Sequence, residues 1–420
     1  MDLAPVVTAL RTRLTRDLSQ LDPGQMDADA IEQLVARFFG ELERQGVDVP
    51  PADRHRAADA AWDAVLGVGP LAEPMHDPTV SEIMVNGPHR VFVEREGVTS
   101  LTPLRFRDED ELRLFVQRML VLAPGKRLDT STPWVDLSLP GGTRVNVCIP
   151  PIVAGGPHVT VRKYLRSLDT LEEVVAKGTM DARMARLLAS AVRARAGILF
   201  SGAAGTGKTT LLEVAAKHVP ARERIVVIED TLELHFYQPD VVRLLTRISN
   251  VEGRGEVTIG DLFRNSLRMR PDRIVLGEIR GKEALDYLQA LNSGHRGTLA
   301  VIHAASPEEA VVRLENLVPL AGLGVPFQVT RQQIAQGLDL VVQLSRWPDG
   351  VRRVDRVAEV SGLAHDGTVA LRDLFVFRAE GADEDGRVRG RFVSTGVAPK
   401  LWRACALAGV PLSEADYRDE

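Results

Sequence analysis

A glycine-rich run between residues 202 and 209 carries the clearest chemistry in the sequence, because it fits the pattern G-x-x-x-x-G-K-[ST]. It follows an apolar stretch typical of a strand and precedes a stretch typical of a helix, the setting in which such a loop wraps around phosphate groups. Lys208 can reach the β- and γ-phosphates of a nucleotide, and the Thr209 hydroxyl is a natural Mg²⁺ ligand. The residues predicted to bind nucleotide are Gly202, Ala203, Ala204, Gly205, Thr206, Gly207, Lys208, Thr209 and Thr210.

Acidic side chains stand at the ends of two apolar runs downstream of this loop, 224–230 and 273–278, each typical of a buried strand. The first run ends in Glu229 and Asp230, and the second ends in Glu278. Because ligands of open parallel sheets bind at the carboxyl ends of the strands, both ends are predicted to meet the loop. Hydrolysis of a bound nucleotide needs an oriented water and a held Mg²⁺, so these acids are its candidates. The alternative is that they are ordinary solvated acids.

Two histidines flank a third apolar run at 298–302, His295 before it and His303 after it. A histidine at a strand end can hydrogen-bond a phosphate or relay its presence to a neighbouring element. A structural role is the alternative for each of them.

The framework that positions these residues is predicted from hydrophobic periodicity. Helical spacing is clear at 30–45 and continues at 57–66, and alternating strands and helices after residue 181 are typical of a parallel sheet covered on both faces. An Asn86-Gly87 turn predicts a hairpin early in the second segment. The predicted segments are a helical region at 1–70, an α+β domain at 71–165, a linker at 166–180, a parallel-sheet domain at 181–345 and a β-rich extension of hairpins at 346–420.

Composition bounds the class of protein. The chain has 420 residues, of which 45% are apolar and 26% charged, so it is expected to be a soluble globular protein of two or three domains. The formal net charge of −5 argues against bulk electrostatic binding to DNA or anionic lipid. With no long apolar run and no signal-peptide core, the chain is expected in the cytoplasm, where Cys148 and Cys405 would be buried thiols.

Four segments together resemble the secretion ATPase superfamily, which drives type II and type IV secretion, conjugation and type IV pilus assembly. They look like its Walker A motif (GAAGTGKT), Asp box (IEDTLEL), variant Walker B motif (SLRMRPDRIVLGEIRG) and His box (GHRGTLAVIHA). The Walker B variant is diagnostic, because the pair Gly277 and Glu278 stands where many P-loop enzymes carry an aspartate. The resemblance covers about residues 55–400.

Within the superfamily, the sequence is most similar to the Tad/Cpa pilus ATPases, often called the CpaF family. The segments that carry this similarity are VSEIMVNG, WVDLSLPGGTRVNV, HVTVRKY, NVEGRGEVTIGDLFRNSLRMRPDRIVLGEIRG and FVFRAEGADEDGRVRGRFVSTGVAPK. The resemblance implies an α/β fold, in which a PAS-like α+β domain precedes a RecA-like P-loop NTPase domain. It also implies a hexameric ring of such subunits.

The resemblance assigns roles to the candidate residues, with ATP and Mg²⁺ bound between the two domains. Glu229 and Glu278 would polarise water and, with Thr209, organise Mg²⁺, and the division of labour between the two acids stays open. Two arginines, Arg144 and Arg162, match those that reach from the N-terminal domain toward the phosphates, although solvated strand residues are the alternative. A charge supplied by a moving domain couples closure to hydrolysis. His295 and His303 would act in the His box.

The implied function is a cytoplasmic motor ATPase at the inner face of the bacterial inner membrane, held there by platform proteins. It would power assembly of a Tad/Flp-type type IV pilus, with retraction left open. The alternatives are a conjugation or type IV secretion ATPase and a nucleotide-gated scaffold with little hydrolysis. A RecA-like DNA motor is disfavoured by the net charge of −5, and no nucleic-acid partner is expected.

Overall fold

A computed structural model divides the chain into two compact units, Met1–Arg166 and Ser167–Glu420, each of which is described by itself. The predicted helix at 57–66 lies largely outside the described residues. The structure describes residues 3–18, 28–47, 49–50, 53–54, 57, 61, 68–95, 97–121, 126–139, 143–163, 168–247, 254–410, 412–413 and 417.

The first unit opens with two helices, α1 (Ala4–Leu18) and α2 (Ala28–Arg44). Helix α2 confirms the helical periodicity of 30–45, and its buried Phe38 and Phe39 pack with Leu10 and Leu14 of α1. Two short helical turns, η2 (Gly69–Leu71) and α4 (Ala72–His76), then lead into a sheet.

This sheet has six antiparallel strands in the order β3-β2-β1-β6-β5-β4. Every second residue of β5 and β6 is buried, as in Val145, Val147, Val159 and Val161, because successive side chains of a strand point to opposite faces. These residues form one core with α5 (Glu109–Val121). The strands are β1 (Val80–Asn86), β2 (Val91–Arg95), β3 (Val98–Leu101), β4 (Trp134–Ser138), β5 (Arg144–Cys148) and β6 (His158–Arg162).

The hairpin predicted at Asn86-Gly87 is present, but its loop is longer than a two-residue turn. Val85 pairs with Val91, and the Asn86 N–H donates to the Arg90 carbonyl, so residues 87–90 form the loop. Gly87 has a φ of +71°, which explains why glycine follows the strand.

The second unit contains a nine-stranded sheet in the order β15-β14-β13-β12-β7-β11-β10-β8-β9. The six strands from β12 to β9 in this order are parallel, and most are buried over their whole length because helices cover both faces. They are β7 (Ile198–Gly202), β8 (Ile225–Glu229), β9 (Val241–Leu245), β10 (Arg273–Leu276), β11 (Leu299–Ile302) and β12 (Leu340–Arg346).

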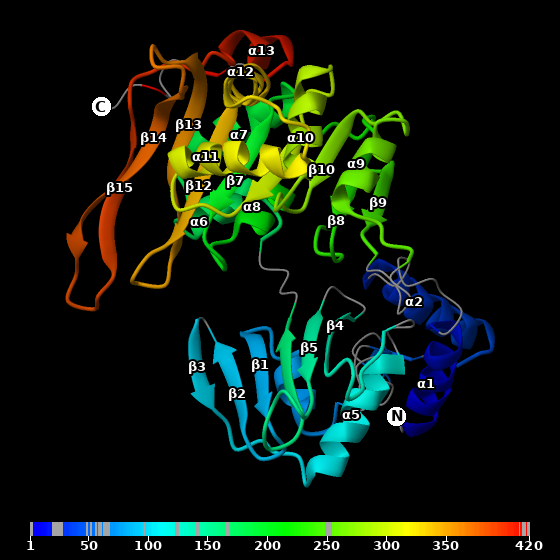
Figure 1. Ribbon diagram of the computed structural model, residues 1–420. Coiled ribbons are helices and arrows are strands. Elements are labelled where there is room, and N and C mark those ends of the chain that lie inside the picture. Colours follow the sequence, from blue (N-terminus) through cyan, green and yellow to red (C-terminus); the bar gives the residue numbers. More distant parts are fainter. Residues whose placement is uncertain are drawn as a thin grey trace. The chain divides into compact units, whose positions relative to one another are not determined.

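The predicted C-terminal hairpins continue this same sheet. Strand β13 (Arg352–Leu363) pairs antiparallel with β12, and β14 (Val369–Ala382) and β15 (Val388–Ser394) follow it to the edge (Figure 1). The strands of this extension therefore share one sheet with the parallel strands, because β12 pairs with β7 on one side and with β13 on the other.

Two hydrophobic cores lie on the two faces of the sheet. One is shared with α6 (Leu171–Ala176), α7 (Ala182–Arg193), α8 (Lys208–Ala216) and α13 (Trp402–Leu407). The other is shared with α9 (Ile259–Ser266), α10 (Glu283–Asn292), α11 (Pro307–Leu317), η4 (Val318–Ala321) and α12 (Phe327–Gly337) (Figure 1). This confirms the α/β class, with an antiparallel sheet in the first unit and a helix-covered, largely parallel sheet in the second.

Both cysteines are free thiols, Cys405 buried and Cys148 only half-buried. None of the helices in the described part of the chain is both long enough and apolar enough to cross a membrane.

Candidate nucleotide-binding site

The glycine-rich run connects the carboxyl end of β7 to the first turn of α8, as predicted. A Cβ at Gly202 would clash with the carbonyl oxygen of Leu344 on the neighbouring strand, so glycine is needed for this close approach. Gly207 has a φ of +92° and is the N-cap of α8. The loop therefore turns sharply, and the amino end of α8, with its partial positive charge, faces the space above β7.

Lys208 is buried, and its side chain folds back onto the glycine-rich loop. Its Nζ donates to the Ala203 carbonyl oxygen at 2.6 Å, and the Thr206 hydroxyl donates to the same oxygen at 2.9 Å. Thr209 and Thr210, the next two residues of α8, are half-buried. The ammonium group is thus already held at the loop that would receive the phosphates.

Glu278 lies just beyond the carboxyl end of β10 and has a partner on each carboxylate oxygen. Oε2 lies 2.6 Å from Arg280 Nη2, and Oε1 lies 3.3 Å from His303 Nε2. Burial would raise the pKa of Glu278, but the hydrogen bond and charge of Arg280, with the charges of His303 and Lys208, lower it below its ordinary value. The pKa of His303 is lowered by burial and by the charge of Lys208. Glu278 is therefore ionised at neutral pH and lies within electrostatic reach of the phosphate loop.

Glu229 ends the adjacent strand β8 and is in a different environment. Its Oε1 accepts the backbone N–H groups of Glu233 and Leu234, both at 3.0 Å. Its Oε2 is buried and has no hydrogen-bond partner among the described residues. Burial raises the pKa of Glu229 to about 8, so this carboxyl is mostly protonated at neutral pH. The two candidate acids thus differ in charge, although their strands pair in parallel.

The local structure explains why residue 277, which precedes Glu278, is a glycine. A Cβ at Gly277 would lie 3.1 Å from Glu229 Cγ and 3.5 Å from Glu229 Cβ. Only a residue without a side chain leaves the Glu229 side chain its present position, so Gly277 and Glu229 depend on each other.

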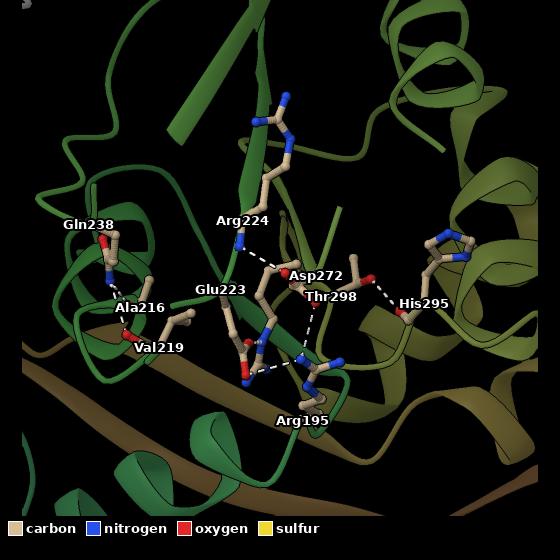
Figure 2. A network of polar contacts seen from close by, with 10 residues as sticks. Arg195, Ala216, Val219, Glu223, Arg224, Gln238, Asp272, His295 and Thr298 are labelled. Carbon is tan, nitrogen blue, oxygen red and sulfur yellow. Dashed lines mark hydrogen bonds and ion pairs between the residues drawn. The ribbon is translucent and has the colours of Figure 1, made fainter. Parts of the chain in front are cut away.

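The structure separates the two histidines. His303 follows β11, at the edge of the sheet where the phosphate loop lies, whereas His295 precedes the strand and lies at the opposite edge. Its carbonyl oxygen accepts the Thr298 hydroxyl at 2.9 Å (Figure 2). His295 is therefore not brought to the phosphate loop of its own chain, because a strand of four residues spans roughly 13 Å.

Arg144 and Arg162 face each other directly on neighbouring strands of the first unit. They are register partners in the β5–β6 pair, and Glu82 of β1 is the partner of Arg162 on its other side. Arg162 Nε lies 3.8 Å from Glu82 Oε1, and the Arg162 side chain is exposed. Like charges directly opposite each other destabilise a sheet, and Glu82 offsets part of this repulsion at Arg162.

Comparison with known proteins shows to which family the chain belongs. The sequence profile described as "Type II/IV secretion system protein" matches residues 66–393, which contain the whole arrangement above. The chain belongs to this family.

Family relatives include named conjugation proteins. A putative conjugal transfer protein of Mycobacterium tuberculosis is 38% identical over 300 residues, covering 70% of this chain and 84% of that protein. The protein VirB11 of Rhizobium radiobacter is 30% identical over 315 residues, covering 67% of this chain and 89% of its own length. The crystal structure of the pilus retraction motor PilT with bound ADP has a TM-score of 0.51 at 17% identity, covering 71% of this chain and 83% of that one, and so shares the fold.

One further residue of this secretion-family chain was missed by sequence reasoning. Arg352 opens β13, and a Cβ at Gly207 would lie 3.4 Å from its Cδ, so the arginine lies against the phosphate loop. The signal was not readable in the sequence, because residues 207 and 352 meet only through the pairing of β12 with both β7 and β13.

The raised pKa of Glu229 predicts that nucleotide-free protein loses stability as the pH rises. In the unfolded chain this carboxyl titrates near 4.5, whereas in the folded protein it holds its proton up to about pH 8. The stabilisation is complete below the unfolded value and is lost as the pH rises through the folded one. Because glutamine imitates the protonated carboxyl, the unfolding free energy of Glu229→Gln should lie within about 1 kcal/mol of wild type at pH 5 and exceed it by roughly 2–4 kcal/mol at pH 9.

Chemical denaturation at pH 5, 7 and 9 measures this difference. Glu384→Gln, in the exposed β14–β15 loop, is the control and should differ from wild type by the same amount at each pH. A Glu229→Gln difference that does not grow with pH would show that Glu229 is ionised in the folded protein.

Proposed function

We propose that this chain is the ATP-hydrolysing motor subunit of a type IV-type secretion or conjugation machine. The observation that carries the proposal is the meeting of Lys208, Glu278 and His303 at the carboxyl edge of the parallel sheet, where the charge of Lys208 lowers the pKa of both other groups. A buried cation on a glycine loop with an ionised carboxylate beside it suits a bound nucleoside triphosphate and its metal.

In this proposal, each residue of the site has its own role in ATP binding or hydrolysis. The loop N–H groups and Lys208 bind the β- and γ-phosphates, and Glu278, being ionised, contributes to the metal ligand set with the Thr209 hydroxyl. Glu229 has a buried oxygen without a partner among the described residues, and it orients the attacking water or, once it has lost its proton, contributes to the same ligand set. These oxygen donors fit Mg²⁺, which when bound neutralises phosphate charge.

Arg144 and Arg162 supply the remaining positive charge in this proposal. They lie in the first unit, so the γ-phosphate charge is neutralised only when that unit approaches the nucleotide. Domain closure is then coupled to hydrolysis, and a ring of six such subunits transmits the motion to membrane-embedded platform proteins. The subunit itself would lie in the cytoplasm against the inner membrane.

Two kinds of machine are candidates for the assembly in which this chain acts. The name of the mycobacterial relative favours conjugal transfer, and the description of the matching family favours a secretion system. The Tad pilus motor remains the second candidate, supported by the sequence segments at 80–87, 134–147 and 375–400 that resemble that branch. Membrane proteins that co-purify with a hydrolysis-blocked variant decide between them, since a conjugation channel supports the first and a pilus platform supports the second.

Phosphate release by the purified chain tests the proposed activity. Wild type should hydrolyse ATP without added nucleic acid, and Arg144→Ala and Arg162→Ala should keep ATP binding but lose most turnover, because they leave the phosphate loop intact. No phosphate release with or without the membrane partner would favour a nucleotide-gated scaffold. A rate stimulated by DNA, with steep salt dependence, would favour a DNA motor.

A further inference from the structure

A pocket lies at the edge of the parallel sheet opposite the phosphate loop. Its volume is about 770 Å³. It is formed by the segments after α7, after α8 and before β9, all of which precede strands, whereas the phosphate loop follows one. The lining residues are Arg193, Arg195, Lys217, His218, Val219, Pro220, Ala221, Arg222, Glu223, Tyr237, Gln238, Pro239 and Ala408.

The lining is strongly basic in a chain of net charge −5. Four of its side chains are cationic and one, Glu223, is anionic. Glu223 is already neutralised, because its carboxylate accepts Arg273 Nε at 2.5 Å and lies 3.1 Å from Arg195 Nη2. The electrostatic potential of this pocket is therefore positive.

Two of the cations are available to a ligand. Arg193 and Arg222 are exposed, and neither has an ion-pair or hydrogen-bond partner among the described residues. The other two have partners within the protein: Arg195 pairs with Glu223 and Asp272 (Figure 2). Lys217 pairs with Asp169. An anion that enters the pocket thus meets two guanidinium groups that no carboxylate of the described chain neutralises.

The backbone of Arg195, a residue of the pocket wall, has a conformation that is strained for any residue other than glycine. Arg195 has a φ of +60°, in the left-handed region that glycine favours at a helix end. Its N–H donates to the Val192 carbonyl and that of Ala196 to the Ala191 carbonyl, the hydrogen bonds of a Schellman motif. Glycine would adopt this conformation with less strain, but the arginine supplies a side chain whose Nη2 lies 3.1 Å from Glu223 Oε1 and 3.4 Å from Asp272 Oδ1.

The pocket also has an apolar component. Tyr237 is half exposed and lies under Lys217, whose Nζ is 5.0 Å from the ring centroid. Val219, Pro220, Pro239 and Ala408 add apolar surface. Gln238 fixes the wall that carries Tyr237, because its Nε2 donates to the Ala216 carbonyl at 2.9 Å (Figure 2). Such mixed lining suits a ligand with both carboxylates and apolar side chains.

We infer that this pocket binds an acidic peptide segment of a partner protein, with carboxylates on Arg193 and Arg222 and an apolar side chain on Tyr237. Phosphate suits it less, because the backbone that reaches the pocket is the carboxyl end of α7 and of α8, where carbonyl groups carry partial negative charge. The separate carboxylates of a peptide, each bound to a guanidinium group, are repelled less by these carbonyl groups than a single compact phosphate dianion would be.

The pocket is joined to the nucleotide site by two elements of the fold. Helix α8 begins at Lys208 of the phosphate loop and is followed by Lys217 and His218 of the pocket. The segment held by Glu229 through the N–H groups of Glu233 and Leu234 continues directly to Tyr237. A peptide seated here contacts elements that also form the nucleotide site, yet leaves the phosphate loop open.

Fluorescence anisotropy of nucleotide-free protein tests the inference, with a fluorescein-labelled EELEEL peptide as the probe at low salt. Wild type should bind this peptide, and the double variant Arg193→Glu with Arg222→Glu should bind it at least about tenfold more weakly. Both positions are exposed, so the fold should be kept. The matched control is Arg378→Glu with Arg389→Glu, which makes the same charge change on the exposed ribbon of β14 and β15 and should change binding less than about twofold.

Several outcomes would overturn the inference. The first two are that both double variants weaken peptide binding equally, and that wild type does not bind the peptide at about 1 mM. The third is that a KKLKKL peptide binds as tightly as EELEEL. The fourth is that inorganic phosphate, at a concentration at or below the peptide Kd and at matched ionic strength, displaces the bound peptide. The last outcome would identify a small-anion site. Lys208→Ala should still bind the peptide, so the result does not depend on whether the chain hydrolyses ATP.

Discussion

Replacing Lys208 by alanine is expected to weaken ATP binding by about ten- to a hundredfold, since a hydrogen bond to a charged group contributes about 1.5–3 kcal/mol. Lys208 is the buried cation of the loop, held 2.6 Å from the Ala203 carbonyl oxygen. Its removal leaves the loop N–H groups to face the triphosphate charge alone. Titration calorimetry with a non-hydrolysable ATP analogue measures the loss.

The fold should survive this substitution. Lys208 Nζ donates to the carbonyl of Ala203, an exposed residue whose oxygen water can reach, and the glycines that shape the loop are untouched. Lys177→Ala, at the exposed C-cap of α6, is the control for loss of one positive charge and should bind ATP as wild type does. Unchanged ATP affinity in Lys208→Ala would remove the loop from the nucleotide site.

The parts of this structure that were readable from the sequence are those with a short-range cause. The loop at 202–209 lies between a strand and a helix because its own glycines and flanking apolar residues specify both. The strands ending near Glu229 and Glu278 are buried runs without alternation, and parallel pairing brings their carboxyl ends to one edge.

The parts that the sequence did not resolve depend on pairing or burial. His295 and His303 looked equivalent as residues flanking one strand, but strand direction puts only His303 at the loop edge. Glu229 and Glu278 looked equivalent as strand-end acids, yet burial keeps the first mostly protonated and Arg280 keeps the second ionised. Arg193, Arg222 and Tyr237 form one pocket only because three amino-terminal strand edges meet.

Glu278→Gln is expected to keep ATP binding and to slow phosphate release by at least about a thousandfold, an effect typical of removing a charge placed for the transition state. The substitution keeps the shape of the side chain but removes the negative charge. Its two neighbours, Arg280 Nη2 at 2.6 Å and His303 Nε2 at 3.3 Å, then face a neutral amide. Arg280 remains anchored, because its Nη1 also lies 3.4 Å from Asp230 Oδ2.

ATP binding survives in this variant because the loop and Lys208 are unchanged, so the two substitutions separate binding from turnover. Single-turnover phosphate release, measured beside ATP affinity, distinguishes them, and Glu384→Gln on the far loop of β14 and β15 should leave both unchanged. If Glu278→Gln turned over at a near-normal rate, the ionised carboxylate beside Lys208 would be structural. The protonated carboxyl of Glu229 would then be the remaining acid able to organise water, and its pKa of about 8 would appear in the pH dependence of the rate.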